Sequence, residues 1–249
     1  METALRTQGL RKTFGGLAAV DGVSLECRVG RVHAVIGPNG AGKTTLINLL
    51  SGDLAPSAGR IEILGREVAG LPPRRISQLG VGRSYQRTNI FMSFTAFENC
   101  RLAAQSRLPI SMRFIRPASR YAEVNQAAER ALDLCGLGSQ HGTIAAALSH
   151  GERRQLEVAM TLATSPRVLL LDEPLAGMGA EEAERMVGLL RRLGEAHAML
   201  LVEHDMDAVF AIAATLTVMV DGRVLASGTP AEIRANAQVQ EAYLGAADE

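Results

Sequence analysis

Residues 37–45 read GPNGAGKTT, a run in which three glycines precede one lysine and two threonines. This spacing matches the pattern G-x-x-x-x-G-K-[ST], in which backbone N–H groups of a glycine-rich loop cradle phosphate oxygens. Lys43 is placed to reach the terminal phosphates of a nucleotide, and Thr44 to ligate Mg2+. The candidate phosphate-binding residues are Gly37, Pro38, Asn39, Gly40, Ala41, Gly42, Lys43, Thr44 and Thr45. The alternative is a glycine-rich turn without a ligand, and the predicted strand before it and helix after it favour the phosphate loop.

Two adjacent carboxylates, Asp172 and Glu173, follow the apolar run 168–171. Such a run is typical of a buried strand in an open parallel sheet, where the carboxyl end of the strand delivers residues to the ligand crevice. We expect Asp172 to hold Mg2+, directly or through water, and Glu173 to polarise an attacking water molecule. A solvated strand end is the alternative, and the phosphate loop in the same chain favours the functional interpretation.

Residues 148–152 read LSHGE, where Ser149 and Glu152 have the spacing of a capping box. A helix is therefore expected to begin here whatever the function. A capped helix start with Gly151 for close approach is also an anion site, so the serine hydroxyl and exposed N–H groups could bind a γ-phosphate. Both interpretations can hold at once.

The surrounding sequence indicates one large α/β domain with an inserted helical segment. Short strands are expected at 4–10, 20–27, 31–36 and 59–64, separated by glycine-containing turns. Alanine- and arginine-rich helical segments follow, and this insertion ends near residue 163. Strand and helix then alternate again; the expected strands are 167–171, 198–202, 216–220 and 223–227, and the expected helices are 180–193 and 206–213.

Composition excludes several classes of protein. Lys and Arg number 26 against 26 Asp and Glu, so no global field favours nucleic acid, and no nucleic-acid partner is expected. The cysteines, Cys27, Cys100 and Cys135, are odd in number and widely spaced, which predicts packing residues in a reducing compartment. No apolar signal core or run of ~18 apolar residues is present, so we expect a soluble, cytoplasmic chain.

Five motifs occur in one order along the chain: the loop 37–44, Gln86 in RSYQR, LSHGE at 148–152, LLLDEP at 169–174 and His204 in VEHDM. With these five motifs in this order, the chain resembles the ATP-binding subunit of an ABC transporter over nearly its whole length. The resemblance implies a P-loop NTPase core with a mostly parallel sheet, an antiparallel β fringe and an inserted helical subdomain. It implies one domain over 1–249, with the core in 1–86 and 164–249 and the helical subdomain in 87–163.

The resemblance also implies that two such subunits face each other. ATP and Mg2+ then lie between the phosphate loop of one subunit and Ser149, Gly151 and Glu152 of the other.

Further roles carry over by position. Phe14 matches the aromatic side chain that stacks on adenine, with a core phenylalanine as the alternative. Gln86 matches the glutamine that senses Mg2+ and the attacking water and borders the membrane subunit. His204 matches the histidine that contacts the γ-phosphate, an assignment that depends on its spacing from Glu173. The implied catalytic set is Lys43, Gln86, Glu173 and His204, and the implied metal set is Thr44, Gln86 and Asp172.

Two departures from the family pattern stand out. His150 and Glu152 occupy positions where many relatives have glycine and glutamine, while Ser149 and Gly151 remain. Gly179 stands where the loop after the second acidic motif usually has an aspartate. Glycine has no side chain to make that contact across a dimer, so this position cannot link the two sites as an aspartate would.

Segments 14–25, 175–178, 202–210 and 241–245 resemble the branched-chain amino acid importer branch, and its larger ATP-binding subunit in particular. Relatives in that branch also import urea, short amides or aromatic acids. The implied partners are a second ATP-binding subunit, identical or different, membrane-spanning permease subunits and, indirectly, a periplasmic or extracellular solute-binding protein. The implied location is the inner face of the cell membrane, reached through the permease.

Three other classes remain as alternatives. A soluble ABC ATPase acting on ribosomes or DNA repair usually has paired cassettes or long coiled coils, and neither is evident in this sequence. A P-loop kinase would not need the LSHGE segment, and a regulatory binding module would lack the catalytic pair. The transported solute, the coupling ratio and the choice between homodimer and heterodimer are left open.

Overall fold

The computed structural model describes residues 2–85, 89–107 and 121–244. Two compact units divide the chain. The first comprises Met1–Val81, Arg167–Glu173 and Leu190–Glu249, and the second comprises Gly82–Pro166 and Pro174–Leu189. Residues 174–189, which the sequence pattern assigns to the core segment, belong to the second unit.

A six-stranded sheet contains the strands that precede the predicted catalytic residues. Its order is β10-β9-β3-β8-β7-β6. The strands are β3 (Arg31–Ile36), β6 (Val81–Arg83), β7 (Val168–Asp172), β8 (Ala198–Val202), β9 (Thr215–Val220) and β10 (Arg223–Gly228). The pairs β3/β8, β3/β9 and β7/β8 are parallel, and β10 pairs with β9 antiparallel. The predicted mostly parallel sheet is confirmed.

The register of this sheet places three strand ends in one row. Val35 of β3 lies opposite Val202 of β8, and Val202 lies opposite Asp172 of β7. Because these strands are parallel, the segments that follow them emerge at the same edge of the sheet. The phosphate loop, Glu173 and His204 therefore start from one edge.

Both faces of the sheet are buried, as expected for parallel strands. Along β3 the side chains alternate between two apolar clusters: Val35 belongs to one, and Ala34 and Ile36 belong to the other. All five residues of β7 and of β8 are buried. The helices of the first unit are α1 (Lys43–Ser51), α2 (Pro73–Gln78), α7 (Met206–Ile212), α8 (Pro230–Ala235) and α9 (Ala237–Leu244).

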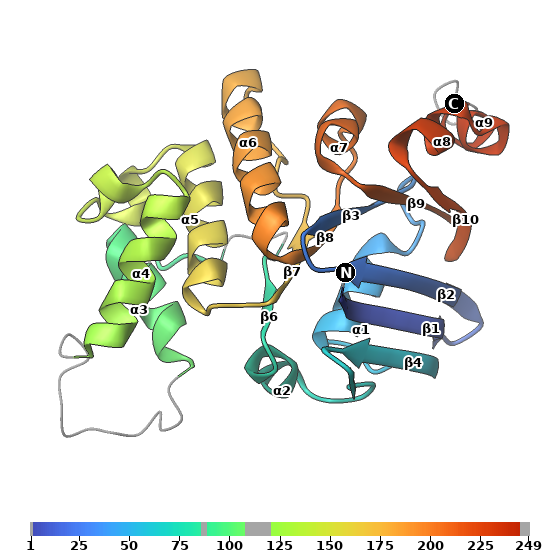
Figure 1. Cartoon of the computed structure of the whole chain (residues 1–249), viewed down its shortest axis with the longest axis horizontal. Coiled ribbons are helices and arrows are strands. Elements are labelled where there is room, and N and C mark those ends of the chain that lie inside the picture. The colour runs from blue at the N-terminus through green and yellow to red at the C-terminus, as the bar shows by residue number, and fades with distance from the viewer. Residues whose placement is uncertain (1, 86–88, 108–120, 245–249) are drawn as a thin grey trace. The chain divides into compact units, whose positions relative to one another are not determined.

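The predicted antiparallel fringe is a four-stranded sheet of order β2-β1-β4-β5. Its strands are β1 (Thr3–Phe14), β2 (Leu17–Arg28), β4 (Ala58–Ile63) and β5 (Arg66–Glu67). Its neighbouring strands are antiparallel. The fringe is drawn in blue and teal near the N-terminus (Figure 1).

Three mutually packed helices dominate the second unit: α3 (Ala96–Gln105), α4 (Ala122–Leu134) and α5 (His150–Ala163). They lie side by side (Figure 1). Two short 3-10 turns, Gly138–Gln140 and Ala145–Ala147, lie between α4 and α5. The helix α6 (Ala180–Ala196) begins in this unit.

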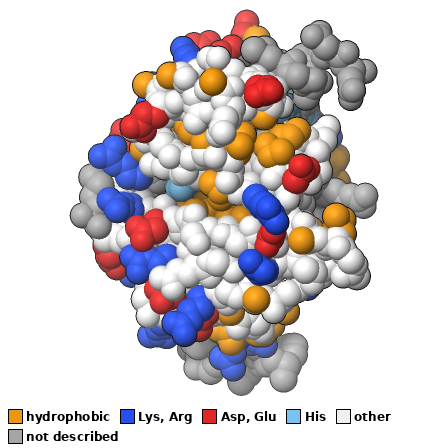
Figure 2. Space-filling model, turned by 90° about the vertical axis from the view of Figure 1, so that its right-hand side faces the viewer, with side chains coloured by type: hydrophobic (Ala, Val, Ile, Leu, Met, Phe, Trp, Pro, Cys, Tyr) orange, Lys and Arg blue, Asp and Glu red, His pale blue; other side chains and the backbone are white. Residues whose placement is uncertain are grey.

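The three cysteines lie in the core, as predicted for packing residues. Cys27, Cys100 and Cys135 are buried free thiols, and burial raises the pKa of the Cys100 thiol to about 12. None of the helices in the described ranges combines the length and apolar character that crossing a bilayer requires. Figure 2 shows acidic and basic side chains interspersed on the face it presents.

Candidate functional site

The loop after β3 is shaped by its glycines. Gly42 is the N-cap of α1 and has φ 92, in the left-handed region that favours glycine. A Cβ at this position would overlap the carbonyl oxygen of Ala19. The first turn of α1 contains no acidic residue. Its N–H groups and positive dipole end are therefore available to an anion.

Lys43 folds back over the loop. Its Nζ donates hydrogen bonds to the carbonyl oxygens of Gly37, at 2.6 Å, and Pro38, at 2.9 Å. The residue is only 8% exposed. Burial lowers the pKa of the ammonium, while the negative charges of Glu173 and Asp172 act in the opposite direction. The two carboxylates therefore lie within electrostatic reach of the lysine, which is the juxtaposition a phosphate and its counter-ion require.

The strand β7 ends at Asp172, which is 1% exposed. Glu173, the next residue, has φ 50, a conformation uncommon for residues other than glycine. Its backbone N–H donates to the carbonyl oxygen of Val202 at 2.9 Å, which fixes the residue against the end of β8. Backbone strain of this kind clusters at functional sites, where the surrounding structure holds it in place.

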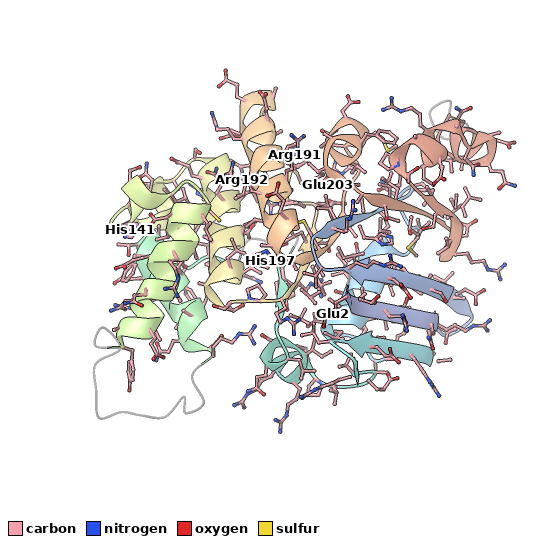
Figure 3. The ribbon with its side chains drawn as sticks, in the orientation of Figure 1. Glu2, His141, Arg191, Arg192, His197 and Glu203 are labelled. Atoms are coloured by element: carbon pink, nitrogen blue, oxygen red, sulfur yellow. The ribbon has the colours of Figure 1, made fainter. Side chains whose placement is uncertain are left out.

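The three residues after β8 differ in burial and in their contacts. Glu203 is fully buried, and its Oε2 accepts a hydrogen bond from the backbone N–H of His204 at 3.2 Å. The His204 side chain is 64% exposed, with Nδ1 3.8 Å from the same oxygen. Asp205 caps α7 by accepting from the N–H of Ala208. Figure 3 labels Glu203 beyond the end of β8 and His197, which directly precedes that strand.

Phe14 ends β1 and is 47% exposed, so it is not a core residue. The Nζ of Lys12 lies 5.2 Å from the centroid of its ring. This Nζ also donates to the carbonyl oxygen of Ala55 at 2.8 Å. About half of the residue is exposed to solvent, and stacking on adenine stays a prediction.

In the second unit the predicted capping box at the start of α5 is confirmed. The Ser149 Oγ accepts from the N–H of Glu152 at 3.1 Å, and the N–H of Ser149 donates to Glu152 Oε2 at 2.8 Å. His150 packs on the loop before α6: its Nε2 donates to the carbonyl oxygen of Ala176 at 3.2 Å. The residue that departs from the family pattern thus joins the helix tip to that loop.

The structure brings part of the predicted site together. Lys43, Asp172 and Glu173 share one edge of the six-stranded sheet with the start of the His204 segment, all in the first unit. Ser149, Gly151 and Glu152 share the tip of α5 in the second unit. Gln86 lies outside the described residues, so its catalytic and metal roles stay predictions.

Two site residues were not singled out from the sequence. Glu203 follows an all-apolar strand, as Glu173 does, and this position could have indicated it. Glu182 accepts from the N–H groups of Gly151 and Gly179. Gly179 and Glu182 are three residues apart, the spacing of a capping box, although glycine lacks the hydroxyl of the usual Ser or Thr. This spacing could have indicated the hydrogen bond from the Gly179 N–H to Glu182.

The residues present suit Mg2+. Asp172 offers buried carboxylate oxygens, and Thr44 offers a hydroxyl in the first turn of α1. No cluster of three or more His, Cys, Asp and Glu side chains within the described ranges could hold an ion by itself. Such a sparse oxygen set fits a metal that takes one or two protein ligands and completes its shell with phosphate oxygens and water.

Comparisons with known proteins agree with this geometry. The family described as ABC transporter matches residues 20–176, and that described as branched-chain amino acid ATP-binding cassette transporter matches residues 223–249. The chain is 40% identical over 251 aligned residues, 98% of each chain, to the high-affinity branched-chain amino acid transport ATP-binding protein BraF of Pseudomonas aeruginosa. Identity and coverage are the same for LivG of Salmonella typhimurium, which carries the same description.

The fold agrees with a crystal structure of the ADP conformation of an ABC transporter cassette. The TM-score is 0.87 at 28% identity, covering 98% of this chain and all of the other. The chain therefore belongs to the ABC transporter family, as an ATP-hydrolysing cassette of its branched-chain amino acid branch.

Proposed function

We propose that the chain powers an importer of branched-chain amino acids by binding and hydrolysing ATP. The observation that carries the proposal is the shared sheet edge of the phosphate loop, Asp172 and Glu173. It occurs in a chain 40% identical, along its length, to relatives named for that transport.

The residues of the first unit have separate tasks in this proposal. The N–H groups of the loop and of the first turn of α1 bind phosphate oxygens, and Lys43 exchanges its two carbonyl contacts for the terminal phosphates. Phe14 stacks on the adenine. Thr44 and Asp172, with Gln86, would hold Mg2+, which when bound neutralises charge on the phosphate oxygens.

Hydrolysis then depends on the ends of β7 and β8. Glu173 orients and polarises the attacking water, and its position is fixed by the hydrogen bond to Val202. His204 contacts the γ-phosphate from a backbone held by Glu203. Gln86 senses the metal and the water.

The partners are a second ATP-binding subunit, permease subunits and, through them, a solute-binding protein. One subunit's nucleotide lies against the other's Ser149, Gly151 and Glu152. Two ATP close the pair and move the attached permease, and hydrolysis reopens it. The chain is peripheral on the inner face of the membrane.

Uptake into proteoliposomes that contain the permease subunits and both cassettes, with the solute-binding protein on the opposite side of the membrane, tests the cargo. With ATP on the cassette side, labelled leucine should accumulate in wild type and not in a Glu173→Gln variant. Accumulation of urea, a short amide or an aromatic acid without leucine would overturn the proposed cargo. Failure of the chain to copurify with the permease, with ATPase activity retained, would favour a soluble ABC ATPase.

A further inference from the structure

The carboxylate of Glu182 lies on the tip of α5. Its Oε1 accepts hydrogen bonds from the N–H of Gly151 at 3.2 Å and from the Oγ of Ser149 at 3.3 Å. Its Oε2 accepts from the N–H of Gly179 at 3.4 Å. All four residues belong to the second unit. One carboxylate thus joins the helix tip to the loop that precedes α6.

The contact is close and electrostatically favourable. A Cβ at position 151 would lie 2.5 Å from Oε1 and Cδ of Glu182, so only glycine leaves room for the carboxylate there. A negative group at a helix N-terminus is stabilised by the unpaired N–H groups and the helix dipole. In this conformation the tip already holds an anion that belongs to the chain itself.

Under the proposed function, the same hydroxyl and N–H group receive the γ-phosphate of ATP bound to the other subunit. A carboxylate and a phosphate cannot both occupy these donors, because they carry like charge and need the same space. We propose that Glu182 is an internal competitor of the γ-phosphate, which must leave Ser149 and Gly151 before the two cassettes close. This inference rests on the proposed function.

The structure provides a place for the displaced carboxylate. Glu182 and Arg185 both line a cavity of about 310 Å³ next to the tip, together with Gln140 and Gln155. Arg185 is exposed and makes no ion pair with any residue the structure describes. It lies three positions after Glu182 on α6, a spacing at which opposite charges on a helix pair. Rotation of the side chain toward Arg185 would exchange one set of charge-assisted contacts for another.

Displacement of the Glu182 carboxylate would also break its hydrogen bond to Gly179. Gly179 stands where the family pattern usually has an aspartate, and its N–H donates to the same carboxylate. Displacement of Glu182 by a phosphate would release this N–H at the same moment. The chain would then signal nucleotide contact to the loop through Glu182 instead of through a side chain at 179.

The test measures closure in the assembled transporter, permease subunits with both cassettes, carrying Glu173→Gln to stop hydrolysis. Fluorescence energy transfer between the cassettes reports the ATP concentration for half-maximal closure. In this background, Glu182→Ala should lower that concentration about tenfold, or about 1.4 kcal/mol, the scale of one charge-assisted hydrogen bond. Glu182→Gln, which keeps the shape and loses the charge, should lower it about threefold.

Glu181→Gln is the matched control, since Glu181 is an exposed acidic residue in the same first turn of α6. With this substitution, the cassettes should close at the same ATP concentration as in the reference, the transporter that carries Glu173→Gln alone. Binding of a fluorescent ATP analogue to the isolated chain should be equal in all variants, because the phosphate loop is unchanged.

The outcomes separate the two proposals. If the reference binds no ATP, or shows no ATP-dependent energy transfer, the proposed function fails. If the reference closes but the Glu182 variants need the same or more ATP, the competitor role of Glu182 is wrong. Should Glu182→Ala fail to fold, Glu182→Gln decides by the same criterion.

Discussion

Two glycines of the phosphate loop share a backbone conformation but differ in their surroundings. Gly40 has φ 81 with nothing within 4 Å of an added Cβ, whereas at Gly42, with φ 92, the added atom would overlap Ala19. Both alanine variants should lose about 1–2 kcal/mol for the left-handed backbone. Gly42→Ala should lose more, because the overlap displaces either the loop or β2. Equal free energies of unfolding in urea for the two variants would contradict this account of the loop.

His33 makes stability depend on pH. Its Nδ1 hydrogen-bonds the carbonyl oxygen of Glu26, its Nε2 lies 2.8 Å from Thr217 Oγ1, and burial lowers its pKa below 6.5. The unfolded chain therefore takes up a proton at a pH where the folded chain does not, and stability falls as the pH drops through 6.5. His33→Gln should lose less stability than wild type between about pH 7.5 and 5.5. Parallel free-energy curves for the two proteins would exclude this role.

At the residue scale, local spacing was enough to identify the phosphate loop, the carboxylate pair and the capping box at Ser149. It could not indicate the φ of 50 at Glu173, because that conformation depends on a hydrogen bond to Val202 on a neighbouring strand. Likewise the contact of Glu182 with Gly151 joins residues 31 apart in sequence.

At the element scale, the predicted strands and the later helices agree with the structure to within a few residues. β1 runs past the predicted end at residue 10 to Phe14, because register shifts around Gly9 let the strand bend without ending. The helices α2, α8 and α9 were not predicted. Two of them, α2 and α8, span six residues each, too few for a helical period to stand out.

The segment before α3 exposes apolar side chains in a fixed arrangement. Phe91 and Phe94 stack with ring centroids 5.2 Å apart, and Phe91 and Met92 are 50% and 41% exposed. The fully buried Asn99 holds the segment: its Oδ1 accepts from the N–H of Phe91, and its Nδ2 donates to that residue's carbonyl oxygen. An exposed apolar cluster is typical of a docking surface.

Under the proposed function, we expect this cluster to contact the permease subunits. Replacing both phenylalanines, Phe91→Ser with Phe94→Ser, should reduce copurification of the permease subunits at least tenfold, because buried aromatic anchors each contribute about 2 kcal/mol or more at interfaces. ATP binding by the isolated chain should be unchanged. Retention of the permease by the double variant would show that docking uses another surface.

At the scale of the whole molecule, the sequence predicts a single ATPase domain with an inserted helical subdomain. The structure divides the chain into two compact units. The alternation of strands and helices indicated which residues form the sheet. It assigned the start of α6 to the core, since nothing in the local pattern shows that Glu182 bonds to the tip of α5. The boundary depends on contacts between distant segments, which periodicity does not report.

The central claim is that this chain hydrolyses ATP with Glu173 as the residue that activates water. Steady-state hydrolysis and ATP binding of Glu173→Gln test it most directly, with Glu184→Gln, an exposed carboxylate on α6, as the control. We predict that hydrolysis falls at least about 100-fold. ATP should still bind and hold the cassettes closed, and the control should match wild type. Hydrolysis at the wild-type rate in Glu173→Gln would contradict the account.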